Sequence, residues 1–336
     1  MAILLTGGTG YIGSHTAAVL VQAGHEVVLL DNLSNSRRDV VERLCQITGR
    51  TLPFVQADVR DRVRVAEVLR EHGCTAVVHF AGFKAVGESV QKPLAYFDNN
   101  VGGTVALLQA MQDVGVSTIV FSSSATVYGD PQYLPLDEAH PTSAVNPYGR
   151  TKLHIEEMLA DLCRAYPAWR VACLRYFNPA GAHPSGLIGE DPNGIPNNLM
   201  PYIAKVASGE LPSLGVFGND YPTPDGTGVR DYIHVIDLAE GHAAALSFLQ
   251  REAGWHAINL GTGQGYSVLE MVRAFEQACG HPIAYEIKAR RPGDIASCYA
   301  NPTKADSVLG WRASRGIEEM CESTWRWRRH VLSSRT

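Results

Sequence analysis

The chain has 336 residues, of which 45% are apolar and 19% charged, a balance typical of a soluble globular protein of one large or two smaller domains. Its net charge of −5 argues against a broad nucleic-acid or anionic-membrane surface, so the expected ligand is a small molecule held by local donors. The seven cysteines are widely spaced and include no Cys-x-x-Cys pair. The apolar residues 1–6 lack a basic region and run directly into glycines, unlike a secretory signal, and no apolar run approaches the length of a membrane span. We therefore expect free thiols and a cytoplasmic location.

A glycine-rich turn follows the first predicted strand. Residues 2–6 form an apolar run, Gly7, Gly10 and Gly13 come directly after it, and a helical stretch follows. Glycines at this spacing let the backbone turn tightly, approach a pyrophosphate and pack the helix on the strand, with the helix N-terminus facing the anion. This order predicts a dinucleotide-binding unit.

An acid ends the second predicted strand. Residues 27–30 are apolar and are followed by Asp31, 18 residues after Gly13. An acid at this place can bond both ribose hydroxyls of a dinucleotide and repels a 2′-phosphate, so it favours NAD over NADP. A helix cap or a solvated turn is the alternative role for such an Asp.

The alternation of strand and helix then continues. We predict further strands at 53–57, 76–80 and 118–122, and helices at 61–71, around 93–114 and across Tyr148. Repeated βα units predict an α/β fold with a Rossmann-type, doubly wound parallel sheet. Ligands bind beyond the carboxyl ends of such strands. The residues that fall there are Asp58, Phe80, Ala81, Gly82, Ser122, Ser123 and Ser124.

The pattern loosens in the second half of the chain. Runs of Pro and Gly at 179–201 and 212–228 predict long binding loops. We expect an NAD-binding domain over 1–177 and a smaller α/β substrate lobe over 178–336, with some crossover of the chain between them.

Tyr148 and Lys152 have the spacing of residues on one helix face. A Tyr that acts as a base near neutral pH needs its pKa lowered by about three units, and a nearby cation shifts it in that direction. Chance also places Tyr and Lys at this spacing on solvated helices, so the pair gains meaning from its context.

That context resembles the extended short-chain dehydrogenase/reductase superfamily, and within it the UDP-galactose 4-epimerases. The glycine turn, Asp31, the strand-end serines and the Tyr148-Lys152 pair occur in the superfamily's order. Four longer segments are similar to the epimerases, at 81–90, 122–129, 175–179 and 228–234. The similarity runs from residue 3 to about residue 327.

The resemblance implies an isomerase that inverts C4 of UDP-galactose and UDP-glucose reversibly through a transient 4-keto sugar. Tyr148 would remove the 4-hydroxyl proton while C4 passes hydride to NAD. Ser124 would bridge the hydroxyl and Tyr148, and Lys152 would bind the nicotinamide ribose and, with the positive nicotinamide ring, lower the pKa of Tyr148.

The resemblance also implies the binding residues. The cofactor set is Gly7, Gly10, Tyr11, Ile12, Gly13, Asp31, Asn32, Asn35, Asp58, Val59, Phe80, Ala81, Gly82, Lys84, Asn99, Ser122, Tyr148, Lys152 and Tyr176. The UDP-sugar set is Ser124, Tyr148, Asn178, Asn198, Leu199, Phe217, Arg230, Arg291, Asp294 and Cys298. In it, Arg230 and Arg291 suit a diphosphate and Phe217 would lie against the uracil.

Related nucleotide-sugar dehydratases carry Thr-Asp-Glu where this chain has Ser124-Ala125-Thr126. Eliminating water needs an acid and a base, and neither carboxylate is present here. Epimerisation therefore fits better. The alternatives are a 4-epimerase acting mainly on UDP-GlcNAc or a UDP-uronate, and a catalytically silent NAD-binding sensor.

Three further expectations complete the sequence interpretation. Cys298 stands where some epimerases have a bulky Tyr, so we hypothesise that the pocket also accepts UDP-GlcNAc and UDP-GalNAc, with a buried Cys of no selective role as the alternative. Ile155, Met158, Leu159 and Leu162 form an apolar stripe that faces either the sheet or, as the family implies, a homodimer partner. No His-Glu-x-x-His motif occurs, and we expect no metal.

Overall fold

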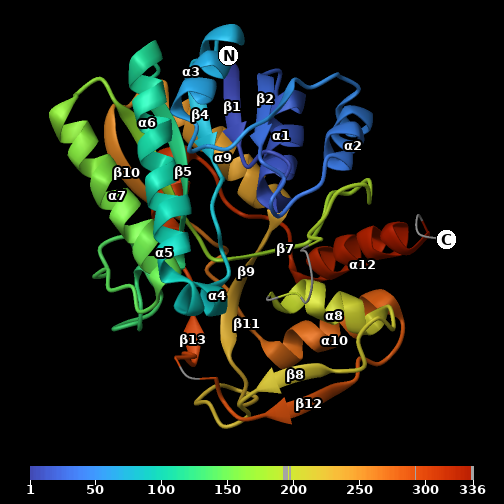
Figure 1. Ribbon diagram of the computed structural model, residues 1–336. Helices are drawn as coiled ribbons and strands as arrows, with labels where there is room; N and C mark the ends of the chain where they lie inside the picture. Colours follow the sequence, from blue (N-terminus) through green and yellow to red (C-terminus); the bar gives the residue numbers. More distant parts are fainter. Residues whose placement is uncertain (192–195, 197, 292, 334–336) are drawn as a thin grey trace.

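The computed structural model describes residues 1–191, 196, 198–291 and 293–333. A larger lobe holds the N-terminal strands and helices, and a smaller lobe below it carries β8, β12, α8 and α10 (Figure 1). No helix in this described part of the chain has both the length and the apolar character needed to cross a membrane.

The larger lobe is built on a seven-stranded sheet in the order β10-β6-β5-β4-β1-β2-β3. Its strands are β1 (Ala2–Thr6), β2 (Glu26–Asp31), β3 (Phe54–Gln56), β4 (Ala76–His79), β5 (Thr118–Ser124), β6 (Arg170–Tyr176) and β10 (Gly254–Leu260). Every neighbouring pair is parallel. The predicted Rossmann-type fold is confirmed.

Helices cover both faces of this sheet, which is why its strands are apolar on both sides. One face carries α1 (Tyr11–Gln22), α2 (Asp39–Thr48), α9 (Val235–Leu249) and α11 (Thr303–Leu309). The other carries α3 (Arg62–Glu71), α6 (Gly103–Val114) and α7 (Pro147–Ala165). Successive β1 residues alternate between the two cores, Ile3 and Leu5 in the first and Leu4 in the second.

The helix predicted around 93–114 is not regular. It starts as α5 (Pro93–Tyr96) after the short α4 (Val86–Gln91), and a π-helical turn at Phe97–Gly102 leads into α6. The Asn100 side chain stabilises this turn, because its Oδ1 accepts from the Phe83 amide at 2.8 Å and its Nδ2 donates to the Phe83 carbonyl at 3.0 Å. Such π-helical turns often lie at functional sites.

The smaller lobe has two short sheets and its own apolar core. One sheet pairs β8 (Leu214–Phe217) with β12 (Tyr285–Lys288), and the other joins β7 (Asn178–Ala180), β9 (Val229–His234), β11 (Gly265–Ser267) and β13 (Ser297–Cys298). The helices are α8 (Leu199–Ala207), α10 (Val268–Cys279) and α12 (Ile317–Ser333).

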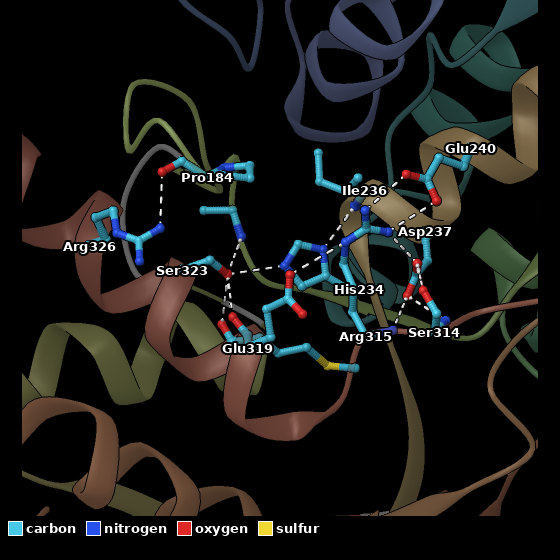
Figure 2. Close-up of polar contacts among 12 residues, drawn as sticks. Pro184, His234, Ile236, Asp237, Glu240, Ser314, Arg315, Glu319, Ser323 and Arg326 are labelled. Atoms are coloured by element: carbon cyan, nitrogen blue, oxygen red, sulfur yellow. Dashed lines mark hydrogen bonds and ion pairs between the residues drawn. The ribbon is translucent and has the colours of Figure 1, made fainter.

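The chain crosses between the lobes more than once. Helix α9 and strand β10 follow residue 177 in sequence but lie with the large sheet, and α12 returns to the smaller lobe. Figure 2 shows the polar contacts where the chain enters α12. Arg315 contacts both Asp237 and Glu240 of α9, and Asp237, which is fully buried, also accepts from the Ser314 and Arg315 amides at 3.2 and 2.9 Å. This junction joins the start of α12 to α9 and so connects the smaller lobe to the large sheet.

Candidate active site

The glycine turn forms a close-packed cradle between β1 and α1. Gly7 has a φ of +68°, and a Cβ added to Gly13 would lie 2.3 Å from the Gly7 carbonyl oxygen. Helix α1 begins at Tyr11 without a side-chain cap, so the amides of its first turn, including those of Ile12 and Gly13, have no acceptor within the helix. Backbone donors at a helix N-terminus suit a pyrophosphate.

Asp31 lies beside this cradle and is 8% exposed. Its Oδ2 accepts from the Thr9 amide at 3.2 Å, while Oδ1 accepts from the Leu33 amide and the Ser36 hydroxyl, both at 2.9 Å. These donors fix the carboxylate at the carboxyl end of β2. Its acceptors and the glycine cradle fit a dinucleotide whose ribose hydroxyls donate to Asp31.

Asp58, which follows the end of β3, is a second carboxylate held in place by hydrogen bonds. Arg60 donates to Asp58 through Nε at 3.0 Å and a terminal nitrogen at 2.9 Å, and Asn32 donates to it at 3.1 Å. The Arg60 hydrogen bonds lower the pKa of Asp58 to about 2. Asn35 is exposed, and Val59 is 5% exposed and packs in the second core.

The segment after β4 approaches the glycine turn closely. A Cβ added to Gly7 would lie 2.7 Å from the Ala81 amide nitrogen, so Phe80, Ala81 and Gly82 run beside the cradle. Asn99 of the π-helical turn is 9% exposed and donates to the Asn100 side chain at 3.0 Å.

One carboxylate joins a predicted cofactor residue to a predicted substrate residue. The Lys84 ammonium donates to Glu190 Oε1 at 2.9 Å, and Asn198 Nδ2 donates to the same oxygen at 2.7 Å. The sequence interpretation did not include Glu190, since a single Glu in a long loop gives no pattern.

The predicted catalytic residues lie on two facing elements. Asn146 caps α7 by accepting from the Gly149 amide at 2.8 Å, which sets the start of the helix that carries Tyr148. Ser124 is the last residue of β5, where the strand passes into a 3₁₀ turn, and its hydroxyl accepts from the Thr126 amide at 3.2 Å. The Ser124 hydroxyl also lies close enough to Tyr148 to act on that phenol and lower its pKa.

Lys152 points back toward β5. Its ammonium donates to the Ser122 carbonyl at 2.6 Å and lies 4.8 Å from the Phe121 ring centre and 5.9 Å from that of Tyr148. Burial lowers the pKa of Lys152 to about 7, while the nearby Glu156 carboxylate raises it.

The protein groups around Tyr148 do not lower its pKa. Burial raises it to about 12, and the hydrogen bond with Ser124 offsets only part of this effect. The physical reason is that Lys152 directs its ammonium to Ser122 rather than to the phenol. The protein groups alone therefore do not make Tyr148 a base at neutral pH.

A buried ion pair behind the site was missed from the sequence. Arg175 Nε donates to Glu156 Oε1 at 3.0 Å and a terminal nitrogen donates to Oε2 at 2.7 Å, while the Ser123 hydroxyl donates to Oε1 at 2.5 Å. Two signals could have shown it. Glu156 lies one further turn beyond Lys152 on the same helix face, and Arg175 interrupts an apolar strand.

The predicted UDP-sugar residues gather on the smaller lobe in two groups. In the first, the Arg291 guanidinium lies 3.7 Å from the ring centre of Phe217, so these two side chains stack on each other. In the second, Arg230 of β9 and Cys298 of β13 are register partners. Burial raises the pKa of Cys298 to about 11, so its thiol stays protonated near neutral pH.

The remaining predicted substrate residues lie at the ends of elements. Asn178 begins β7, Asn198 precedes α8, Leu199 is the first residue of α8, and the Asp294 amide donates to the Arg291 carbonyl at 3.2 Å in a turn. Across the described residues, no group of three or more His, Cys, Asp or Glu side chains is arranged to hold a metal ion. All seven cysteines are free.

Known proteins resemble the chain over nearly its whole length. The family described as GDP-mannose 4,6 dehydratase matches residues 4–324. The UDP-glucose 4-epimerase of Bacillus subtilis (strain 168) is 61% identical over 327 residues, which cover 97% of this chain and 96% of that protein.

Two solved structures are similarly close. A UDP-glucose 4-epimerase from Stenotrophomonas maltophila, with bound NAD and formylated UDP-arabinopyranose, is 54% identical with a TM-score of 0.98 and 99% coverage of both chains. A UDP-glucose 4-epimerase from Bifidobacterium longum, in complex with NAD+ and UDP, is 52% identical with a TM-score of 0.96 and the same coverage. With its glycine cradle, Asp31 and the Ser124-Tyr148-Lys152 arrangement, this chain belongs to the UDP-glucose 4-epimerase family of the extended short-chain dehydrogenases/reductases.

Proposed function

We propose that the chain catalyses the reversible, NAD-dependent inversion of C4 in UDP-galactose and UDP-glucose through a transient 4-keto sugar. The observation that carries this proposal is the placement of Ser124 near Tyr148, at a site whose neighbouring positions hold Ala125 and Thr126 in place of carboxylates. A ketone made there has a proton donor for its reduction but no acid and base to eliminate water.

Tyr148 is the proton carrier of the reaction. Bound NAD supplies the hydride acceptor and a positive ring. Ser124 relays the proton of the 4-hydroxyl to Tyr148, and Tyr148 returns it when the ketone is reduced on its other face. Because the same proton is taken and given back, Tyr148 ends each turnover in the state in which it began.

Lys152 has two roles at the site, one in binding the cofactor and one in stabilising the phenolate. Its ammonium donates to the ribose of the bound cofactor, and its charge favours the phenolate of Tyr148, whose ring centre lies 5.9 Å away. Since the protein groups leave the pKa of Tyr148 at about 12, this charge and that of the nicotinamide ring have to supply the shift toward neutral pH.

Conversion of UDP-galactose tests the proposal. Purified protein, incubated without added cofactor, is expected to form UDP-glucose, and Tyr148→Phe is expected to lose most of the rate while still binding NAD and UDP-sugar. Full activity in Tyr148→Phe would refute the role of Tyr148 in the mechanism. Any net conversion would rule out a catalytically silent sensor. The presence of Ser124, Tyr148 and Lys152 together also argues against a sensor, which has no need of all three.

Cys298 carries the proposal that N-acetyl sugars are also substrates. It is the register partner of Arg230 on the face that holds the predicted UDP-sugar residues, and a thiol occupies less space than a Tyr. Wild type is expected to interconvert UDP-GlcNAc and UDP-GalNAc, and Cys298→Tyr to lose this activity while keeping that on UDP-galactose. Absence of UDP-GlcNAc turnover in wild type would refute this.

We also propose a homodimer in the cytoplasm. Ile155 and Leu159 of the predicted stripe are buried in the sheet core, whereas Met158 and Leu162 pack at the edge of that core and also line a groove of about 300 Å³ between α6 and α7. An apolar groove on two neighbouring helices suits the same groove of a second copy. Sedimentation should show a dimer that Leu162→Asp disrupts and that Val63→Asp, a change of an exposed α3 residue, leaves intact.

A further inference from the structure

A buried histidine outside every predicted binding set contacts the active site from α9. His242 is fully buried, and its Nε2 is hydrogen-bonded to the hydroxyl of Tyr176. Its ring also packs on Phe80, with ring centres 4.9 Å apart. Tyr176 and Phe80 both belong to the predicted cofactor set, so His242 supports two residues of one site.

The backbone fixes which nitrogen of His242 carries the hydrogen. Nδ1 lies 2.7 Å from the Leu238 carbonyl oxygen, which can only accept, so Nδ1 is the donor. Burial lowers the pKa of His242 to about 4, and the ring is therefore neutral near pH 7. Nε2 then has a lone pair and no hydrogen.

This tautomer decides in which direction the Tyr176 hydroxyl donates its hydrogen. A hydroxyl has one hydrogen and two lone pairs, and Nε2 takes the hydrogen. The Tyr176 oxygen can only accept from any other partner. Without His242 the same hydroxyl could turn and donate.

Tyr176 lies where the reacting end of the cofactor has to be. It ends β6 and is the register partner of Ser124, which ends β5. The phenol of Tyr148 is close enough to contribute, after burial, to raising the pKa of Tyr176. Because hydride and proton leave the same carbon of the substrate, the nicotinamide end of NAD has to lie beside these two phenols.

We propose that His242 is a positioning residue that holds the Tyr176 hydroxyl as a hydrogen-bond acceptor for the carboxamide N–H of the nicotinamide. This inference rests on the proposed function for the identity of the cofactor. It adds a role for a residue that touches neither cofactor nor substrate. The contact fixes the rotation of the nicotinamide ring, and thereby the face that receives hydride.

The test compares NAD with its 3-acetylpyridine analogue, which lacks the carboxamide N–H. Rates of release of both dinucleotides are measured by exchange on holoenzyme in wild type, His242→Phe, His242→Gln and Tyr176→Phe. Phe keeps the ring that packs on Phe80 but removes the acceptor, while Gln restores an acceptor. Wild type should hold NAD about tenfold longer than the analogue, the value expected for one buried hydrogen bond.

His242→Phe and Tyr176→Phe should each bring the ratio of NAD retention time to analogue retention time near one. The double variant should add no further change, and His242→Gln should recover part of the tenfold ratio. An unchanged ratio in His242→Phe would overturn the proposal. Equal loosening of both dinucleotides would also overturn it, because that is the result of a purely structural role. The ratio is measured without turnover, so a failure of the epimerase proposal would appear separately as absent UDP-galactose conversion.

Discussion

The buried pair of Glu156 and Arg175 gives the sharpest stability prediction. Both side chains are almost fully buried, with 2% and 5% of their side-chain surface exposed, and three direct hydrogen bonds of 3.0, 3.3 and 2.7 Å join them. Arg175→Met would leave the Glu156 carboxylate buried without its cation. Removing one partner of such a pair costs about 3–5 kcal/mol, so we expect a loss of about 4 kcal/mol in the free energy of unfolding.

The double variant Glu156→Leu/Arg175→Met is the informative comparison. Replacing both partners by apolar groups removes the unpaired charge, and only the hydroxyls of Ser123 and Tyr128 then lose a partner. We expect a loss of about 2 kcal/mol, which is less than that of the single variant.

Urea unfolding followed by tryptophan fluorescence measures these differences. Arg62→Met is a matched control, because Arg62 makes a similar two-point contact with Asp113 at 2.7 Å but on the surface. It should leave the unfolding midpoint unchanged. The reasoning is refuted if Arg175→Met is no less stable than the double variant.

Three further changes test other parts of the structure. Gly13→Ala should abolish retention of NAD in purified protein, because the Cβ of the new alanine would lie 2.3 Å from the Gly7 carbonyl oxygen. Retention is measured by the absorbance of the released dinucleotide, and normal retention would contradict the tight turn. The contribution of Lys152 to stability should rise with pH from about 7 to about 10, because the pKa of Lys152 is lowered to about 7 in the folded state and this side chain binds more protons in the unfolded chain over that range. The slope of melting temperature against pH should therefore be less positive in Lys152→Met than in wild type, and an equal slope in both proteins would be the opposing result. Arg315→Met should cost on the order of 2 kcal/mol in urea unfolding because it leaves the buried Asp237 carboxylate to backbone amides and Ser314, whereas an unchanged midpoint would show that those partners suffice.

The sequence predicted the large sheet well because its signals are local. Apolar runs bounded by glycines and acids placed the strands at 2–6, 76–80 and 118–122 within two residues of their observed ends. The π-helical turn at 97–102 was not predictable, because the contacts of Asn100 with the distant Phe83 backbone stabilise it.

Some features of the candidate site were likewise predictable from the sequence, and others were not. Short motifs identified Tyr148, Lys152 and Ser124, and the structure brings all three together at the ends of β5 and α7. The direction of the Tyr148 pKa could not be read from spacing, since it depends on burial and on where the Lys152 ammonium points. His242 contacts Tyr176, which is far away in the sequence, and a pairwise contact of that kind leaves no local pattern, whereas Arg175 can be noticed only as a charge within an apolar strand.

The repeated crossing of the chain between the lobes limits how such an enzyme can be divided or recombined. A fragment ending at residue 177 would lack β10, and the edge of β6 that β10 covers would be open to pairing with other chains. A fragment starting at 178 would carry α9 and β10 with no sheet to join. Exchanging C-terminal halves between relatives would therefore graft a piece of one protein's sheet into the other, and chimaeras that alter sugar preference are better made by swapping loops of the smaller lobe.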